Sequence, residues 1–245
     1  MYFNKIVVIT GSSGQLGRFL VKLFLSLGCV VYGLDKKKTD IKSKNFKFKK
    51  IDLSKFEQIK EVINSIYSIH KKLDIFINNA AISYKSHFSQ RKKNELDTTC
   101  EINLSSVIYI MKLISLKHNK KKICRIINVG SIYGVKSPDF SLYSNNKNIN
   151  SEIYGATKAG IIQITKYFAV ALAKQNILVN CISPGGIRNK KMQNSNFLKK
   201  YKKKVPLKRM AVVEDFETAF LYLSNPKTKY TTGQNIIIDG GLTLC

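Results

Sequence analysis

The stretch KIVVITGSSGQLG, residues 5–17, decides the fold of this chain. After its first lysine come five consecutive β-branched residues, which are typical of a short buried strand. Three glycines follow, Gly11, Gly14 and Gly17, and apolar residues then recur at helical spacing up to position 27. Glycine permits a tight turn, and free N–H groups at a helix start attract phosphate. The stretch therefore predicts a strand, a phosphate-binding turn and a helix.

Seven short runs rich in β-branched residues are spaced along the chain, and helical patterns separate most of them. The runs are residues 5–10, 29–35, 46–52, 73–79, 123–131, 177–183 and 235–239. Alternation of strand and helix implies parallel strands joined by right-handed crossovers. We therefore predict an α/β fold with a doubly wound, parallel seven-stranded sheet of the Rossmann type. Ligands of such sheets bind at the carboxyl ends of the strands.

Length and composition favour a single domain, residues 1–245. Hydrophobic residues make up 44% of the chain, enough for a substantial core, and no linker-like stretch interrupts it. The amino-terminal apolar run is far shorter than the ~20 residues that span a bilayer, so we expect a cytoplasmic protein without membrane association. The five cysteines show no metal-type spacing to the three histidines, which predicts reduced thiols and no metal site.

The formal net charge is +27, from 42 Lys and Arg against 15 Asp and Glu. Such a charge raises nucleic acid or an anionic membrane as a partner. The basic residues, however, fall in short clusters along the whole chain, at 36–38, 91–93, 120–122 and 202–204. We interpret them as a solvated surface and expect no nucleic-acid partner, with attraction of an anionic ligand as the alternative.

An acidic residue ends the second predicted strand. Asp35 lies 24 residues beyond Gly11, where a carboxylate accepts hydrogen bonds from the adenosine ribose hydroxyls and repels a 2′-phosphate. This position favours NAD over NADP as the cofactor. The lysines at 36–38 could accommodate the extra phosphate, so NADP stays an alternative.

One of the 12 tyrosines, Tyr154, precedes Lys158 by four residues in the stretch YGATK. On a helix this spacing places both side chains on one face, so the ammonium can approach the phenol. A free tyrosine has a pKa of ~10, and a nearby cation favours phenolate, which suits the pair to proton transfer at a carbinol oxygen. Tyr133 has Ser137 at the corresponding position, and Tyr143 lies in a polar, Asn-rich stretch typical of a loop.

An ordered series of motifs covers nearly the whole chain. The glycine turn and YGATK are joined by IDL at 51–53, NNAA at 78–81, INL at 102–104, VGS at 129–131, SPGG at 183–186 and TGQNIIIDGG at 232–241. With these motifs the chain resembles the short-chain dehydrogenase/reductase family. The resemblance implies an NAD(P)-dependent oxidoreductase with a catalytic tetrad of Asn103, Ser131, Tyr154 and Lys158.

The resemblance also implies a role for each residue. Tyr154 would be the acid or base, Ser131 would hydrogen-bond the substrate oxygen, and Lys158 would hold the nicotinamide ribose. Asn103 would anchor a water that links Lys158 to solvent. The cofactor would contact Gly11, Ser13, Gly14, Gln15, Leu16, Gly17, Asp35, Asp52, Leu53, Asn79, Ala80, Ala81, Tyr154, Lys158, Pro184, Gly185 and Ile187.

Several features depart from most single-domain members of the family. The glycines read Gly-x-x-Gly-x-x-Gly instead of Gly-x-x-x-Gly-x-Gly, and Ser131 and Tyr154 are 23 residues apart, more than is usual. Arg188 and Asn189 stand near the place where most relatives have a threonine. The residues that bind the nicotinamide end of the cofactor are therefore left open. Together with SIYGVKSPDFSLY, SPGGI and PLKRMA, the chain is similar to a smaller group associated with flagellin modification and with sialic-acid-like sugars of bacterial surface glycans.

We therefore predict hydride transfer between nicotinamide and a hydroxyl or ketone of a sugar derivative, phosphorylated or nucleotide-linked. A 3-oxoacyl-thioester reductase is the nearest alternative, and such an enzyme should prefer NADP. A non-catalytic dinucleotide sensor or a nucleic-acid binder is a third interpretation, against which the intact tetrad argues. The resemblance implies a homodimer or homotetramer, with residues 87–116 as a helical interface.

The segment between Ser131 and Tyr154 predicts a hydrophilic substrate that carries an anionic group. Both of its ends are tied to predicted catalytic residues, so we expect residues 136–151 to form a polar wall at the mouth of the site. Lys136 and Lys147 would meet an anionic group. Hydroxyl and amide partners for a sugar would come from Ser141, Ser144, Asn145, Asn146 and Asn148. A solvated insertion that touches no substrate is the alternative.

Overall fold

The computed structural model describes residues 1–143, 149–189 and 193–245. Its centre is one seven-stranded sheet in the order β3-β2-β1-β4-β5-β6-β7, and all neighbouring strands are parallel. The strands are β1 (Ile6–Thr10), β2 (Val30–Asp35), β3 (Phe46–Lys50), β4 (Ile75–Asn78), β5 (Cys124–Val129), β6 (Ile177–Pro184) and β7 (Asn235–Ile238). The predicted fold class is confirmed, and each strand lies within a few residues of its predicted position.

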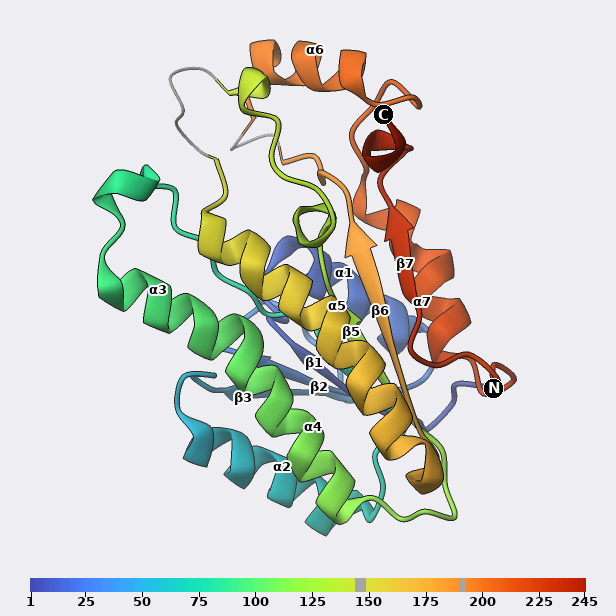
Figure 1. Ribbon diagram of the computed structural model, residues 1–245. Helices are drawn as coiled ribbons and strands as arrows, with labels where there is room; N and C mark the ends of the chain where they lie inside the picture. The colour runs from blue at the N-terminus through green and yellow to red at the C-terminus, as the bar shows by residue number, and fades with distance from the viewer. Residues whose placement is uncertain (144–148, 190–192) are drawn as a thin grey trace.

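Helices cover both faces of this sheet. They are α1 (Gln15–Ser26), α2 (Phe56–His70), α3 (Lys93–Cys100), α4 (Ser106–Lys117), α5 (Glu152–Leu172), α6 (Ser195–Lys204) and α7 (Glu217–Ser224). Figure 1 shows α2, α4 and α5 in front of the sheet, α1 and α7 behind it, and α6 beyond the arrowhead of β6. Helix α6 therefore lies at the edge of the sheet where we expect ligands.

Two apolar clusters attach the helices to the sheet. On one face, α2, α4 and α5 bury Ile59, Ile110 and Ile161. On the other face, α1 and α7 bury Leu20 and Phe220. Strand β1 is covered on both sides, and all five of its residues are buried, which explains its uninterrupted apolar sequence.

The strand order reverses between β1 and β4 at the centre of the sheet. Val7 of β1 pairs with Val31 of β2 on one side and with Ile75 of β4 on the other. At such a reversal the following helices leave to opposite faces, which opens a crevice at the carboxyl ends of the strands. The glycine turn follows β1 directly, so the fold places it in this crevice.

The segment Lys93–Lys117 combines α3, a π-helical turn (Glu101–Ser105) and α4. Within the described parts of the chain, it is the one helix that is long and apolar enough to cross a membrane by length and composition, and half of its most apolar window is buried. Core helices meet the same criterion, and α4 contributes buried side chains to the sheet-packing cluster. Contact with the core accounts for its hydropathy.

Candidate active site

The glycine turn after β1 is closed too tightly for side chains. Gly11 adopts φ +65°, a left-handed conformation that favours glycine. A Cβ atom on Gly17 would lie 2.0 Å from the carbonyl oxygen of Gly11, so only glycine lets α1 begin this close to the turn. Gly14 precedes the first residue of α1 and makes no side-chain cap, which leaves the helix N–H groups facing the crevice.

The end of β4 is fastened to the same turn. The amide Nδ2 of Asn79 donates to the carbonyl oxygens of Thr10 at 2.9 Å and Gly11 at 3.1 Å. The backbone N–H groups of Asn79 and Ala80 donate to the hydroxyl of Thr10 at 3.0 and 3.1 Å. Asn79 therefore positions the glycine turn as well as lining the crevice.

Asp35 faces the turn from the end of β2. Its carboxylate accepts hydrogen bonds from the backbone N–H groups of Ser13, at 3.0 Å, and Lys37, at 2.9 Å. Both oxygens are held in place while the side chain lines a cavity of about 400 Å³. The backbone of Ser13 thus holds Asp35 in place, and its predicted contact with the cofactor stays a prediction.

Asp52 and Leu53 follow β3, at the same edge of the sheet. Leu53 lines the cavity, whereas the carboxylate of Asp52 forms an ion pair with Lys36 at 2.9 Å and accepts hydrogen bonds from Ser54. Burial tends to raise the pKa of Asp52, but the bonds from Lys36 and Ser54 hold it below its ordinary value. Asp52 thus engages one of the lysines that could have met a 2′-phosphate.

A second cavity, of about 670 Å³, continues from the first. The two share the lining residues Gln15, Leu16, Asn79 and Ala81, so the crevice runs without a break from Asp35 to the catalytic residues. The crevice fits an extended dinucleotide. The glycine turn would face the pyrophosphate, Asp35 would face the ribose, and the apolar side chains of the first cavity would hold the adenine. We call the second cavity the catalytic pocket.

The catalytic pocket brings together Ser131, Tyr154 and Lys158. Ser131 follows β5, and Tyr154 and Lys158 lie one turn apart near the start of α5. The Nζ of Lys158 is 5.6 Å from the centre of the Tyr154 ring and donates to the carbonyl oxygen of Val129 at 2.6 Å. The shared helix face expected from the YGATK spacing is therefore present.

Burial changes the acidity of both groups on α5. It raises the pKa of Tyr154, and a hydrogen bond with Ser131 opposes this rise. Burial also lowers the pKa of Lys158 to about 8. Near neutral pH the phenol therefore carries its proton, which is the form that can protonate a carbonyl oxygen.

Asn103 lies in the π-helical turn with its side chain 2% exposed. Its Oδ1 accepts from the N–H of Ile82 at 2.8 Å, and its Nδ2 donates to the carbonyl of Ile82 at 2.9 Å and to the hydroxyl of Thr157 at 3.2 Å. Thr157 in turn donates to the carbonyl of Tyr154 at 2.9 Å. Through these bonds Asn103 links the loop after β4 to α5, and its predicted role as the anchor of a water stays a prediction.

The loop after β6 closes the nicotinamide side of the pocket. Pro184, Gly185 and Ile187 line it, as the resemblance implies. The side-chain amide of Gln15 donates to the carbonyl of Arg188 at 2.7 Å, so this loop is tied to the glycine turn across the crevice. Asn189, which stands near the place where most relatives have a threonine, lines the pocket.

Aromatic residues form the opposite wall, which sequence patterns did not reveal. The hydroxyls of Tyr133 and Tyr143 are 2.8 Å apart, and the Tyr143 ring lies 5.4 Å from that of Phe197 on α6. Tyr201, also on α6, accepts a hydrogen bond from the N–H of Gly186 at 2.9 Å. All four aromatic residues line the pocket. Tyr133 and Tyr143 do so although neither has, among the described residues, a lysine partner of the kind that Tyr154 has.

The predicted polar wall needs a correction. Of residues 136–143, Leu142 and Tyr143 line the catalytic pocket, so that part of the wall is largely aromatic and apolar. Lys136 points away and donates to the carbonyls of Leu242 and Cys245, while Ser141 bonds to its neighbour Asp139. Ser144, Asn145, Asn146, Lys147 and Asn148 lie outside the described residues.

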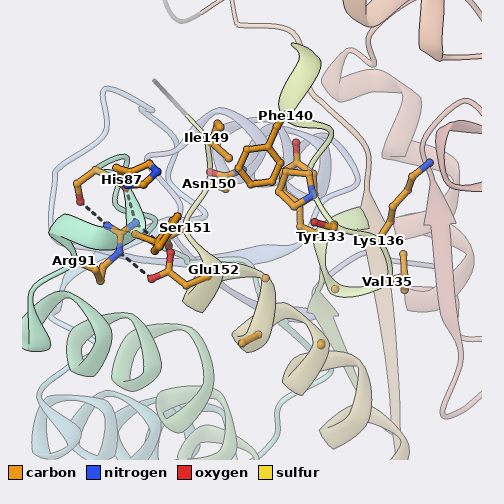
Figure 2. Close-up of a pocket in the computed structure, with 18 residues that line it drawn as sticks. His87, Arg91, Tyr133, Val135, Lys136, Phe140, Ile149, Asn150, Ser151 and Glu152 are labelled. Atoms are coloured by element: carbon orange, nitrogen blue, oxygen red, sulfur yellow. Dashed lines mark hydrogen bonds and ion pairs between the residues drawn. The ribbon is translucent and has the colours of Figure 1, made fainter. Parts of the chain in front are cut away.

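A third cavity, of about 610 Å³, adjoins the catalytic pocket and shares Tyr133 and Asn150 with it. Figure 2 shows Arg91 in this cavity, with dashed lines to Glu152 and to the segment beside His87. The Nε of Arg91 is 3.1 Å from Glu152, and its Nη1 donates to the hydroxyl of Ser86 at 2.6 Å. Arg91 and Glu152 thus neutralise each other, Lys136 at the rim bonds to the backbone of Leu242, and we assign this cavity no chemistry.

Neither metal nor disulfide chemistry is built into the described residues. No group of three or more His, Cys, Asp or Glu side chains there could hold a metal ion, and the five cysteines are free thiols. A dinucleotide crevice that ends at a proton-transfer group defines a dinucleotide-dependent oxidoreductase.

Comparisons with known proteins agree with that class. Residues 17–243 match the family described as Enoyl-(Acyl carrier protein) reductase. The 3-oxoacyl-[acyl-carrier-protein] reductase FabG of Buchnera aphidicola subsp. Schizaphis graminum is 31% identical over 247 residues, 98% of this chain and 97% of that protein. A short-chain dehydrogenase structure from Leptospira borgpetersenii with bound NAD⁺ is 38% identical, with a TM-score of 0.90, over 98% of this chain and 93% of that one.

ElxO with NADP bound is 26% identical and has a TM-score of 0.86, covering 99% of this chain and all of that chain. These likenesses extend over the sheet, the crevice and the catalytic pocket. The chain belongs to the short-chain dehydrogenase/reductase family and is an NAD(P)-dependent oxidoreductase.

Proposed function

We propose that the protein interconverts a ketone and a secondary alcohol, with Tyr154 as the acid or base. The observation that carries the proposal is the unbroken crevice from Asp35 to Tyr154, with Lys158 beside the phenol and Ser131 bonded to it. A bound nicotinamide cofactor supplies or accepts the hydride at the substrate carbon. The protein's own residues handle the proton at the substrate oxygen.

In the reducing direction, Tyr154 donates its phenolic proton to the carbonyl oxygen as the hydride reaches the carbon. Ser131 hydrogen-bonds the same oxygen, and the Lys158 ammonium stabilises the phenolate that forms. Asn103 acts indirectly, because its bonds to Ile82 and Thr157 fix the backbone on which Tyr154 stands. In the oxidising direction each proton moves the opposite way.

For the cofactor we propose a preference for NAD over NADP. Asp35 holds its negative charge at the ribose end of the crevice, and Lys36 is engaged by Asp52. A 2′-phosphate would then meet a carboxylate with one fewer free cation nearby. The 38% identical structure with bound NAD⁺ supports the same choice.

For the substrate we propose a small polar molecule, a phosphorylated or nucleotide-linked sugar being the class we favour. Asn150, Gln193 and Asn194 line the pocket together with aromatic residues. Gln193 bonds to the loop after β6 and the Asn194 oxygen caps α6, so Asn150 is the lining amide nearest to α5. Such a lining suits a hydroxylated ring, whose faces stack and whose edges hydrogen-bond. With this substrate we propose a role in carbohydrate biosynthesis in the cytoplasm. We also propose that the protein has no nucleic-acid partner and forms a homodimer or homotetramer through residues 87–116.

A 3-oxoacyl-thioester reductase is the second candidate. The names of curated relatives favour it, among them the 31% identical reductase of Buchnera. An acyl-thioester reductase is expected to prefer NADPH and to accept an apolar chain. Purified protein assayed with both cofactors, against sugar phosphates, nucleotide-linked sugars and 3-oxoacyl thioesters, separates the two candidates.

The test of the catalytic assignment is Tyr154→Phe, which removes the phenolic proton but keeps the ring. We expect NADH affinity to stay nearly unchanged while turnover falls by more than about tenfold, a barrier increase above ~1.4 kcal/mol. Tyr167→Phe is the matched control, since Tyr167 lies on the same helix with a largely exposed side chain. A Tyr154→Phe enzyme that kept more than about a tenth of wild-type kcat would show that another group moves the proton.

A further inference from the structure

The catalytic pocket contains a second cation that the proposed mechanism does not use. Lys85 lies on the loop after β4 and lines the pocket, and its Nζ forms a hydrogen bond with the side-chain oxygen of Asn150, another lining residue. Asn150 is two residues before the start of α5, the helix that carries Tyr154. Figure 2 shows Asn150 beside Ile149 in the third cavity, and Asn150 lines the catalytic pocket as well.

No carboxylate compensates this ammonium. Among the described residues Lys85 forms no ion pair, and the lining of the catalytic pocket contains neither Asp nor Glu. Residues 144–148 and 190–192 contain no Asp or Glu in their sequence and so bring no acid to this pocket either. Burial alone accounts for the lowered pKa of Lys85. An ammonium taken partly out of water without a counter-charge is destabilising unless a ligand supplies one.

The position of Lys85 points to the substrate half of the pocket. The cofactor half is lined by Gln15, Leu16, Pro184 and Ile187, which belong to the glycine turn and the loop after β6. Lys85 does not line the cavity at Asp35, where the adenosine end would lie. Its partner Asn150 instead belongs to the segment that leads into the catalytic helix.

We propose that Lys85, together with the amide of Asn150, forms a subsite for an anionic group of the substrate, a carboxylate or a phosphate. One proton of the ammonium is used by Asn150, which leaves two for the anion, and the Asn150 amide nitrogen can donate beside them. The subsite rests on the proposed function and restricts it to ketones and alcohols that carry a negative charge. It also replaces Lys136, which the structure directs elsewhere.

Binding of small anions to the complex with NADH tests this subsite. Saturating NADH fills the glycine turn, the other place in the crevice that attracts phosphate. Inorganic phosphate and malonate then serve as probes, read by calorimetry and by the rise in melting temperature that each produces. The variants are Lys85→Gln, Lys85→Arg as the conservative replacement, and Lys60→Gln as the control, which removes a charge from an exposed side chain of α2.

We expect Lys85→Gln to weaken binding of the preferred probe by at least about tenfold, because a charge-assisted hydrogen bond is lost. Lys85→Arg and Lys60→Gln should bind much as the wild type does. The tighter of the two probes identifies the substrate group as phosphate or carboxylate. If the wild-type complex bound neither probe, or if Lys85→Gln bound them as well as wild type, the subsite would be refuted.

The same data distinguish an anion-binding role of Lys85 from a purely structural one. Loss of its bond to Asn150 would lower the melting temperature equally with and without phosphate, and the phosphate-induced shift would not change, which contradicts the proposal. Tyr154→Phe retains Lys85 and should bind the probes normally. Failure of the anion test and failure of the turnover test are therefore separate results.

Discussion

Replacing Gly17 by Ala tests the geometry of the cofactor turn. The new Cβ atom would lie 2.0 Å from the carbonyl oxygen of Gly11, about 1 Å inside the 3.0 Å below which real Cβ contacts essentially never occur. That carbonyl accepts hydrogen bonds from the N–H of Gly14 and the amide of Asn79, both at 3.1 Å. It cannot retreat without lengthening them. The clash is with backbone, so rotation of a side chain offers no relief.

The size of the effect follows from these contacts. Overpacking in a close-packed region is destabilising by about 1–3 kcal/mol, and each weakened hydrogen bond adds about 1 kcal/mol. Alanine is the better helix former by about 1 kcal/mol, which offsets part of this loss because Gly17 lies within α1. We expect a net destabilisation of about 2–4 kcal/mol, or roughly 4–16 °C in melting temperature. NADH affinity should fall by more than about tenfold, since a shift of ~1 Å misaligns the turn.

Chemical denaturation and NADH titration measure both effects, and Gly14→Ala is the matched control. A Cβ on Gly14 would lie 3.3 Å from the same carbonyl oxygen, and Gly14 has a φ of −71° that alanine also adopts. Its unfolding free energy should stay within about 1 kcal/mol of wild type. If Gly17→Ala were as stable as wild type or more so, helix propensity would have prevailed and the close approach of α1 to the turn would be wrong.

Two further predictions concern the cofactor and the proton. Asp35→Ala should lower the ratio of kcat/KM with NADH to kcat/KM with NADPH by about tenfold, because the substitution removes repulsion of the 2′-phosphate. A wild-type enzyme that favours NADPH would contradict the assignment of NAD as the preferred cofactor. Burial lowers the pKa of Lys158 to about 8, so the ammonium that stabilises phenolate is lost as pH rises through that value. Ketone reduction should therefore decline above about pH 8, and a kcat/KM profile that stayed level to about pH 9 would argue against this role.

The fold and the cofactor half of the crevice could be predicted because they depend on local pattern. Five β-branched residues followed by three glycines identify β1 and its turn without any knowledge of distant contacts. The spacing of Tyr154 and Lys158 likewise predicts a shared helix face from geometry alone. The ion pair of Asp52 with Lys36, by contrast, could not be predicted from the motif that contains Asp52.

Features that depend on distant contacts could not be predicted. Lys85 and Asn150 are separated by 65 residues, and nothing in either stretch indicates that they meet. Lys136 has the charge and sequence position expected of a substrate contact, yet it turns to the carboxyl terminus. Tyr143 was correctly read as a loop residue, but only its bond to Tyr133 places it on the pocket wall.

The same division separates the residues that define the reaction class from those that define the substrate. Ser131, Pro184 and Asn79 stand at the ends of strands held by a continuous core, so their positions follow from the sheet. The substrate end is assembled from loops and from α6, which is joined to the sheet through contacts such as that of Tyr201 with Gly186. Loops tolerate change in sequence and length far better than strand ends do. A charge that is half-buried and has no ion-pair partner in that variable region, as on Lys85, is therefore the strongest guide to the substrate.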